Sequence, residues 1–264
     1  METATIDSIS FLTRSETRVR LLEQLLEEGA ATQRDLRVEL DTSRSTVTRA
    51  LNAFQDRGWV RNQEDAYRLT PVGQQVIEAT RRFAETVEAA EGLAPFLRWF
   101  PTEEFDLDIT SLSTATVVTP TDGDPYTPAR TQTELLREAD RFRGLFPSID
   151  LEGSKLVHDQ ITSGALEAEI IVSPSVEETI TAGKFVPLFR EKLETGRLTV
   201  LGGDSDIPFY LGIADGETVQ IGVEDDEGFP RALLEATDER VREWAERVYE
   251  DYRDRATPLS VEAF

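Results

Sequence analysis

The sequence has no cysteine, and only one methionine and one histidine occur among its 264 residues. Without cysteine the chain has no disulfides and no thiolate ligands for a metal ion. No stretch approaches the roughly 20 apolar residues that cross a bilayer, and the acidic residues 1–7 lack the apolar core of a secretory signal. We therefore expect a soluble, cytoplasmic protein with no membrane contact, no metal site and no cofactor.

Basic residues are also scarce, with 28 against 51 acidic residues, and only three of the 28 are lysine. Residues 1–82 hold 12 arginines and 13 acidic residues, a net charge of −1, which leaves −22 for the rest. An acidic surface that prefers arginine to lysine is typical of proteins from a salt-rich cytoplasm. At molar salt the screening length is only about 3 Å, so the acidic part hardly opposes the approach of DNA. We expect a halophilic protein.

Residues 43–54 have the pattern of an amphipathic helix that begins at a good N-cap, Ser43. Apolar residues recur at the spacing of one helix face, namely Val47, Ala50, Leu51 and Phe54. The other face carries groups suited to base edges and phosphates: Arg44, Ser45, Thr48, Arg49 and Asn52. An ordinary amphipathic surface helix would show the same pattern, so the neighbouring segments must show whether this helix belongs to a DNA-binding motif.

Those neighbours complete a helix-turn-helix followed by a hairpin. A short helix is predicted from Thr32 to Leu40, with a break at Asp41-Thr42 that has the usual length of the turn. Gly58 can end the second helix, and residues 59–61 and 67–69 have the composition of two short strands. The sequence therefore predicts an α+β winged helix-turn-helix domain over residues 1–92.

The segments SRSTVTRAL at 43–51, RGWV at 57–60 and LTPVG at 69–73 resemble those of archaeal winged-helix transcriptional regulators. The C-terminal part resembles the effector domain of a haloarchaeal group related to the filamentation regulator of methanogens. The residues that carry this second resemblance are FRGLFP at 142–147, the pair Gly216-Glu217, and apolar positions between Ala232 and Ala256. The resemblance implies a DNA-binding regulator whose activity responds to a ligand or partner.

Residues 93–264 are predicted to form an α/β effector domain with a mixed sheet. We expect strands at 107–109, 115–118, 169–172, 198–201, 209–214 and 218–223, and helices at 131–146, 156–166, 175–195 and 238–255. Asp215-Gly216 is a hairpin signal. In the N-terminal domain, helical patterns cover 5–28 and 73–91; the second ends at Gly92 and turns Val76, Ile77, Phe83 and Val87 inward. Such a helix commonly connects domains and contacts a second protomer.

We expect the following side chains to contact double-stranded DNA: Thr32, Gln33, Ser43, Arg44, Ser45, Thr48, Arg49, Arg61 and Arg68. Arg44, Ser45, Thr48 and Arg49 are assigned to the major groove, where arginine can bind guanine O6 and N7 together. The acidic hairpin tip, Glu64-Asp65, would repel phosphates. We therefore expect it to enter the minor groove only shallowly or to pair with Arg61 and Arg68. A homodimer should read inverted half-sites about one helical turn apart.

Catalytic patterns are absent, and we expect no enzyme. His158 and Asp159 are neighbours on a helix and should not face each other, so they form no preformed dyad. Asp106 and Asp108 would share a strand face, but a hydrated acidic surface explains them better than a cation site. The sequence has neither a phosphate-binding glycine loop nor a nucleophile elbow.

A small-molecule effector would bind between the sheet and its helices. Residue types suggest five lining side chains: Tyr126, Arg130, Arg143, His158 and Tyr210. Two alternatives stay open. One is an acidic protein–protein adaptor with a winged-helix shape but no DNA ligand, since fold does not imply function. The other is a hydrolase fused to a DNA-binding head.

Overall fold

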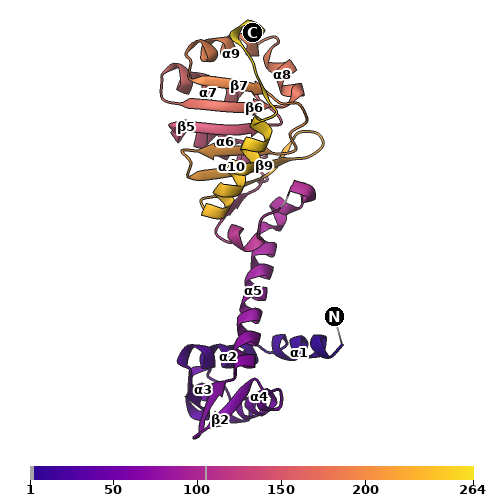
Figure 1. The fold of residues 1–264 in the computed structure, drawn as a ribbon, viewed down its shortest axis with the longest axis vertical. Coiled ribbons are helices and arrows are strands. Elements are labelled where there is room, and N and C mark those ends of the chain that lie inside the picture. The colour runs from indigo at the N-terminus through magenta and orange to yellow at the C-terminus, as the bar shows by residue number, and fades with distance from the viewer. Residues whose placement is uncertain (1–2, 105) are drawn as a thin grey trace. The chain divides into compact units, whose positions relative to one another are not determined.

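The computed structural model describes residues 3–104 and 106–264, which divide into two compact units, Met1–Glu85 and Thr86–Phe264. The division falls within the long helix α5 (Pro71–Leu97), which also contains residue 92, where the sequence predicts the boundary (Figure 1). Within the described ranges, no helix combines the length and the apolar character needed to cross a membrane.

The first unit is helical with a small antiparallel sheet. Its elements before α5 are α1 (Thr3–Thr13), α2 (Glu16–Glu28), β1 (Ala31–Thr32), α3 (Gln33–Glu39), α4 (Arg44–Asp56), β2 (Val60–Gln63) and β3 (Ala66–Leu69). The strand order is β1-β3-β2. The helical pattern at 5–28 is thus two helices, separated at Ser15, whose extended backbone (φ −143°, ψ 107°) is the N-cap of α2.

The predicted inward face of α4 is confirmed, because Val47, Leu51 and Phe54 have no exposed surface and Ala50 is 5% exposed. These side chains pack on the leucines of α2, and Phe54 stacks on Trp59 with ring centroids 6.1 Å apart. The apolar stripe of α4 therefore anchors the helix and leaves its opposite face at the surface.

The two helices α3 and α4 are each followed by a residue with positive φ. Asp41, with φ 43°, turns the chain between α3 and α4. Gly58, with φ 68°, follows α4, where the amides of Gly58 and Trp59 donate to the carbonyls of Gln55 and Phe54. This pair of bonds is the Schellman arrangement, which satisfies carbonyl groups at a helix end.

The second unit is built on an eight-stranded mixed sheet with the order β11-β7-β6-β5-β8-β9-β10-β4. Strands β5, β6 and β7 are parallel, and the other pairs are antiparallel. The strands are β4 (Thr116–Val118), β5 (Arg141–Phe146), β6 (Glu167–Val172), β7 (Leu198–Gly202), β8 (Tyr210–Ala214), β9 (Thr218–Glu224), β10 (Pro230–Ala236) and β11 (Thr257–Pro258). The mixed sheet and the Asp215-Gly216 turn, with φ of 54° and 71°, confirm the prediction.

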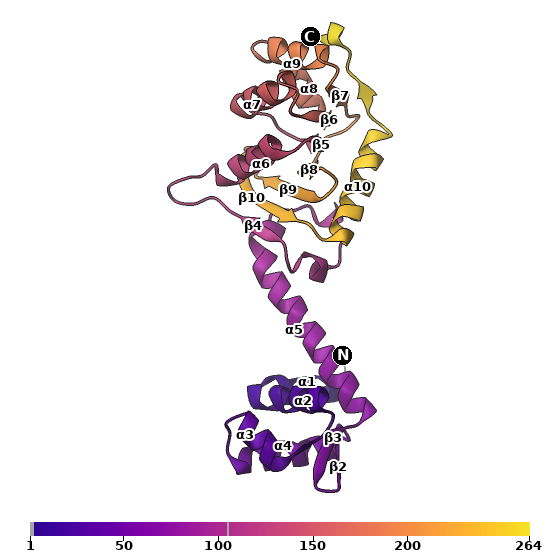
Figure 2. The same cartoon turned by 90° about the vertical axis from the view of Figure 1, so that its left-hand side faces the viewer.

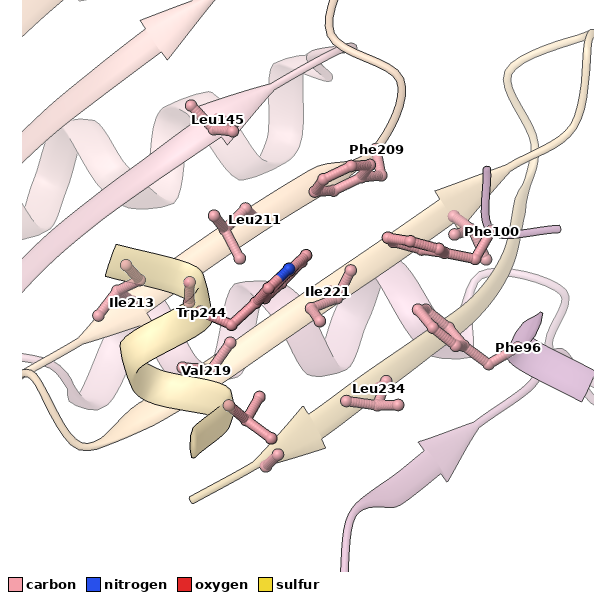
Figure 3. Packing of buried hydrophobic residues seen from close by; sticks show 14 of the residues in the cluster. Phe96, Phe100, Leu145, Phe209, Leu211, Ile213, Val219, Ile221, Leu234 and Trp244 are labelled. Atoms are coloured by element: carbon pink, nitrogen blue, oxygen red, sulfur yellow. The ribbon is translucent and has the colours of Figure 1, made fainter. Parts of the chain in front are cut away.

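Helices cover both faces of this sheet (Figure 2). One face carries α6 (Thr127–Glu138), α7 (Leu151–Thr162), α8 (Pro174–Ile180) and α9 (Phe185–Glu194), over a core that includes Phe142, Ile170 and Tyr210. The other face packs against α10 (Glu239–Arg253) and the end of α5; Trp244, Phe96 and Phe100 lie there over Leu211, Ile221 and Leu234 (Figure 3). The described residues of this unit also form the 3-10 helices η1 (Thr102–Glu104), η2 (Ile109–Leu112) and η3 (Val261–Ala263).

One segment was predicted in the wrong class, and one strand was not predicted. The helix predicted at 131–146 ends at Glu138, and residues 141–146 form β5. Phe142 continues the helical spacing of Leu135, Leu136 and Ala139, so the local pattern favours a helix, whereas pairing with β6 and β8 makes this segment a strand. Strand β10 was missed because Ala232-Leu233-Leu234 consists of good helix formers, and pairing with β9 and β4 decides its conformation.

The structure also differs from the prediction at the strand expected over 107–109 and at the helix expected over 175–195. No strand forms at 107–109, because Asp108 accepts a hydrogen bond from the Thr110 amide (3.0 Å) and begins η2. Asp106 instead accepts from Arg247, so the two carboxylates do not share a strand face. The helix predicted over 175–195 is broken at Gly183 (φ 57°).

Helix α5 runs through Gly92 to Leu97 rather than ending at Gly92. Ile77 is buried as expected, but Phe83 is 60% exposed and Val87 is 39% exposed. The inward orientation predicted for these two is wrong, because helical spacing shows that side chains share a face but not what covers them.

Candidate nucleic-acid interface

The candidate surface begins at the first turn of α4, which is capped by side-chain oxygen. Ser43 has extended backbone and accepts a hydrogen bond from the Thr46 amide (3.2 Å). Its hydroxyl also lies 2.9 Å from the hydroxyl of Ser45 and 2.8 Å from that of Thr46. The cap fixes the start of the helix and places polar groups beside its free amides, where the helix dipole favours an anion.

An open concave surface of about 600 Å³ lies over this turn, lined by Ser43, Arg44, Ser45, Thr48 and Arg49. Arg44 and Arg49 are exposed, and within the described parts of the chain neither forms an ion pair. The Nε of Arg49 donates to the Ser45 carbonyl at 3.4 Å, a long bond that leaves the end of the guanidinium available. The structure thus brings together the five residues assigned to this helix.

Gln33 joins α3 to this surface. Its side-chain amide donates to the hydroxyl of Thr48, which in turn donates to the Arg44 carbonyl (2.8 Å). Gln33 therefore positions Thr48 as well as adding polar surface beside it.

Thr32 has a structural function at the start of α3. Its hydroxyl accepts from the Asp35 amide (3.3 Å), and its own amide donates to the Asp35 carboxylate (3.1 Å). This is a reciprocal capping box. The Thr32 hydroxyl also donates to that carboxylate (2.6 Å), and this bond is the main reason why the pKa of Asp35 is lowered. The hydroxyl is thus occupied within the protein, which leaves it less free for the predicted contact with DNA.

The β2–β3 hairpin places two arginines opposite each other. Arg61 pairs with Arg68 in the register of the strands, and both are exposed. Like charges in this position repel, and a bound anion would relieve the repulsion. The predicted pairing of Glu64 or Asp65 with these arginines does not occur among the residues that the structure describes. Both acidic residues have positive φ (54° and 64°) and form the turn.

The five candidate ligand-binding residues of the second unit do not share one pocket. Arg143 lies on the α10 face, paired with Glu246 and Glu250 and 5.3 Å from the Tyr249 ring. Tyr210 is buried on the opposite face, in the core under α6 and α7. Tyr126 is 54% exposed at the start of α6, and Arg130 pairs with Asp124.

His158 is held by two carboxylates at the surface. Its Nε2 lies 2.8 Å from Glu191 and its Nδ1 lies 3.1 Å from Asp159. The expectation that His158 and Asp159 do not meet is wrong, because both side chains bend around the helix to reach each other. Burial lowers the pKa of His158, but the two hydrogen bonds outweigh it and raise the pKa. No group of three or more potential metal ligands occurs among the described residues.

Two family models match separate parts of the chain. Residues 6–92 match the HVO_A0261 N-terminal domain, and residues 125–255 match the middle domain of the methanogenesis regulatory protein FilR1. No curated protein matches the chain.

Solved structures show distant likeness. TrmBL2, an archaeal chromatin protein described with a novel mode of DNA binding, is 15% identical and aligns over 96% of this chain and 99% of its own, with a TM-score of 0.43. Nuc from Salmonella typhimurium, of the phospholipase D family, is 12% identical over 55% of this chain and 97% of its own, with a TM-score of 0.42. NucT from Helicobacter pylori is 11% identical over 55% and 99%, with a TM-score of 0.39.

Proposed function

We propose that this chain regulates transcription by sequence-specific binding of double-stranded DNA, because residues 6–92 match the HVO_A0261 N-terminal domain and residues 125–255 match the middle domain of the methanogenesis regulatory protein FilR1. The first unit would act as a winged helix-turn-helix, with α4 in the major groove and the β2–β3 hairpin as the wing. The second unit would sense an effector and alter the DNA affinity.

One observation supports this proposal most. Arg44 and Arg49 project from a helix whose other face is buried, and no carboxylate of the described residues pairs with them, although the chain has a net charge of −23. A guanidinium that forms no ion pair is available to bind guanine O6 and N7 together. The hairpin pair Arg61 and Arg68 supplies a second cationic point suited to the phosphate backbone.

The test is DNA affinity measured by fluorescence anisotropy in molar KCl, on genomic fragments selected by the wild-type protein. Arg44→Ala and Arg49→Ala should each weaken specific binding about tenfold, because a good arginine–guanine pair is worth about 1–3 kcal/mol. Arg20→Ala is the matched control, since it removes a surface arginine of α2 that pairs with Glu16 on its own helix. Equal affinities for all four proteins would disprove the proposal.

We also propose that the regulator binds as a homodimer through α5. Phe83 and Val87 lie one helical turn apart and stay exposed, which is unusual for large apolar residues on one face. A two-fold dimer would read inverted half-sites about 34–36 Å apart, or a multiple of this distance. Sedimentation in molar KCl should show a dimer that Phe83→Glu dissociates. A wild-type monomer would contradict the proposal.

A further inference from the structure

Two polar side chains of the second unit are fully buried on one face of the sheet without satisfying their hydrogen-bonding groups. The hydroxyl of Tyr210 on β8 and the side-chain carbonyl of Gln220 on β9 have no hydrogen-bond partner among the described residues. The amide nitrogen of Gln220 donates to the Glu235 carboxylate (2.8 Å). Exchanging the amide oxygen and nitrogen of Gln220 would therefore leave the nitrogen without a partner and place the oxygen against a carboxylate. Unsatisfied buried groups are rare because each one lowers stability.

The sheet brings these two groups to the same place. Gly212 lies directly opposite Gln220 in the register of β8 and β9. The ring of Tyr210 lies along its own strand, and a Cβ at Gly212 would collide with the Tyr210 hydroxyl. A Cβ at Gly222 would likewise lie 3.2 Å from the Cβ of Tyr210. Glycine at these positions therefore allows the phenol to reach over Gly212 toward Gln220.

Helix α6 and two phenylalanines enclose this place. Gln132 of α6 faces the Tyr210 hydroxyl: burial raises the pKa of Tyr210, and Gln132 partly opposes this rise without forming a hydrogen bond of normal geometry. The ring of Phe146 lies edge-on to Tyr210 at 5.3 Å, and Phe142 lies 6.1 Å from Phe146. Gln132 is half-buried, so α6 alone separates the Tyr210 hydroxyl from solvent on this side.

We propose that the effector site of the second unit lies between α6 and the sheet, and that it takes a small uncharged ligand carrying a hydroxyl or a primary amide. A ligand oxygen would accept from the Tyr210 hydroxyl, and a ligand O–H or N–H would donate to the Gln220 carbonyl. Phe142 and Phe146 would contact its apolar part. An anion is disfavoured because Glu235 already shares the Gln220 side chain. This inference depends on the proposed sensing function of this unit.

The first test measures the stability of two matched variants of the full chain. Tyr210→Phe removes an unsatisfied hydroxyl and should leave the Tm unchanged or raise it by about 2–4 °C. Tyr249→Phe is the control, because that buried hydroxyl donates to Glu169 (2.9 Å) on the other face of the sheet, and its loss should lower the Tm. A Tyr210→Phe variant destabilised as much as Tyr249→Phe would show that the Tyr210 hydroxyl is satisfied, and would overturn the proposal.

The second test is a crystal structure of the full chain soaked in acetamide or in glycerol, without DNA. We expect one probe between Tyr210 and Gln220, and we expect calorimetric binding of that probe to weaken at least about tenfold in Tyr210→Phe but not in Tyr249→Phe. A fixed water that neither probe displaces would overturn the proposal. Because no DNA is present, this result is independent of the proposed DNA binding.

Discussion

The side-chain amide of Gln33, at the start of α3, donates a hydrogen bond to the hydroxyl of Thr48 on the exposed face of α4. This bond links the two helices of the proposed DNA-binding motif at the surface that would meet the duplex. Thr48 also donates to the Arg44 carbonyl, so both of its hydrogen-bonding directions are used within the protein. The pair fixes the orientation of Thr48 before any ligand arrives.

A double-mutant cycle tests this coupling. Gln33→Ala and Thr48→Val should each cost about 0.5–1.5 kcal/mol of folding stability, and the double variant should cost less than their sum because the two side chains share one bond. Urea unfolding of the four proteins measures it. Strict additivity would mean that the bond contributes nothing in solution.

Alanine substitutions at Gly58, which follows α4, and at Gly92, which lies inside α5, should change the folding stability in opposite directions. Gly58→Ala should destabilise the chain by about 1 kcal/mol or more, because Gly58 has φ 68° and ends α4. Gly92→Ala should stabilise it by about 0.5–1 kcal/mol, since Gly92 lies inside α5 with no atom within 4 Å of the new Cβ. Denaturant midpoints compare them, and a stabilising Gly58→Ala would contradict the left-handed helix end.

His158 should make stability fall as pH rises. Hydrogen bonds to Glu191 and Asp159 raise the pKa of the folded histidine above 6.5 despite its partial burial. A raised pKa gives a stabilisation that is complete below about pH 6.5 and disappears as the pH passes the folded value. The urea midpoint of the wild type should therefore decline across this window, relative to His158→Gln. Parallel pH profiles for the two proteins would show that the imidazole does not bind these carboxylates in solution.

Lys192 should have the opposite pH dependence. It is 1% exposed, with its Nζ 3.7 Å from the Phe189 ring centroid, and burial lowers its pKa from 10.5 to about 7. Its charged form is therefore costly in the folded state, so this residue makes stability rise with pH between about 7 and 10.5. Lys192→Met should stabilise the chain most at pH 7 and below, and the gain should shrink above it. A destabilised Lys192→Met at pH 6 would contradict this account.

The helix α4 could be predicted from the sequence because cap, apolar spacing and buried partners agree. Ser43, the stripe from Val47 to Phe54 and the end at Gly58 are all local signals, and the structure has each of them. Strands β5 and β10 could not be predicted in this way. Their conformation depends on pairing with strands far along the chain, and the buried run Ala232-Leu233-Leu234 of β10 lacks the alternation that identifies a strand.

The spatial arrangement of the candidate site residues likewise depends on contacts between distant parts of the chain, which local sequence does not reveal. Residue type suggested Arg143 and Tyr210 as one pocket, but the strand class of residues 141–146 puts Arg143 on the α10 face, away from Tyr210. The opposition of Arg61 and Arg68 follows from a register that the turn at Glu64-Asp65 sets, which composition alone does not give. The buried Gln220 had no sequence signal, since a glutamine in a strand is usually exposed.

Methylation interference shows whether α4 binds in the major groove. Guanine N7 lies in the major groove and is one of the two atoms that arginine binds. If α4 reads the major groove, N7 methylation of particular guanines should block binding of the wild-type protein, and Arg44→Ala or Arg49→Ala should abolish the effect at one of them. Specific binding that no guanine N7 methylation disturbs, with the same pattern in both variants, would contradict the account.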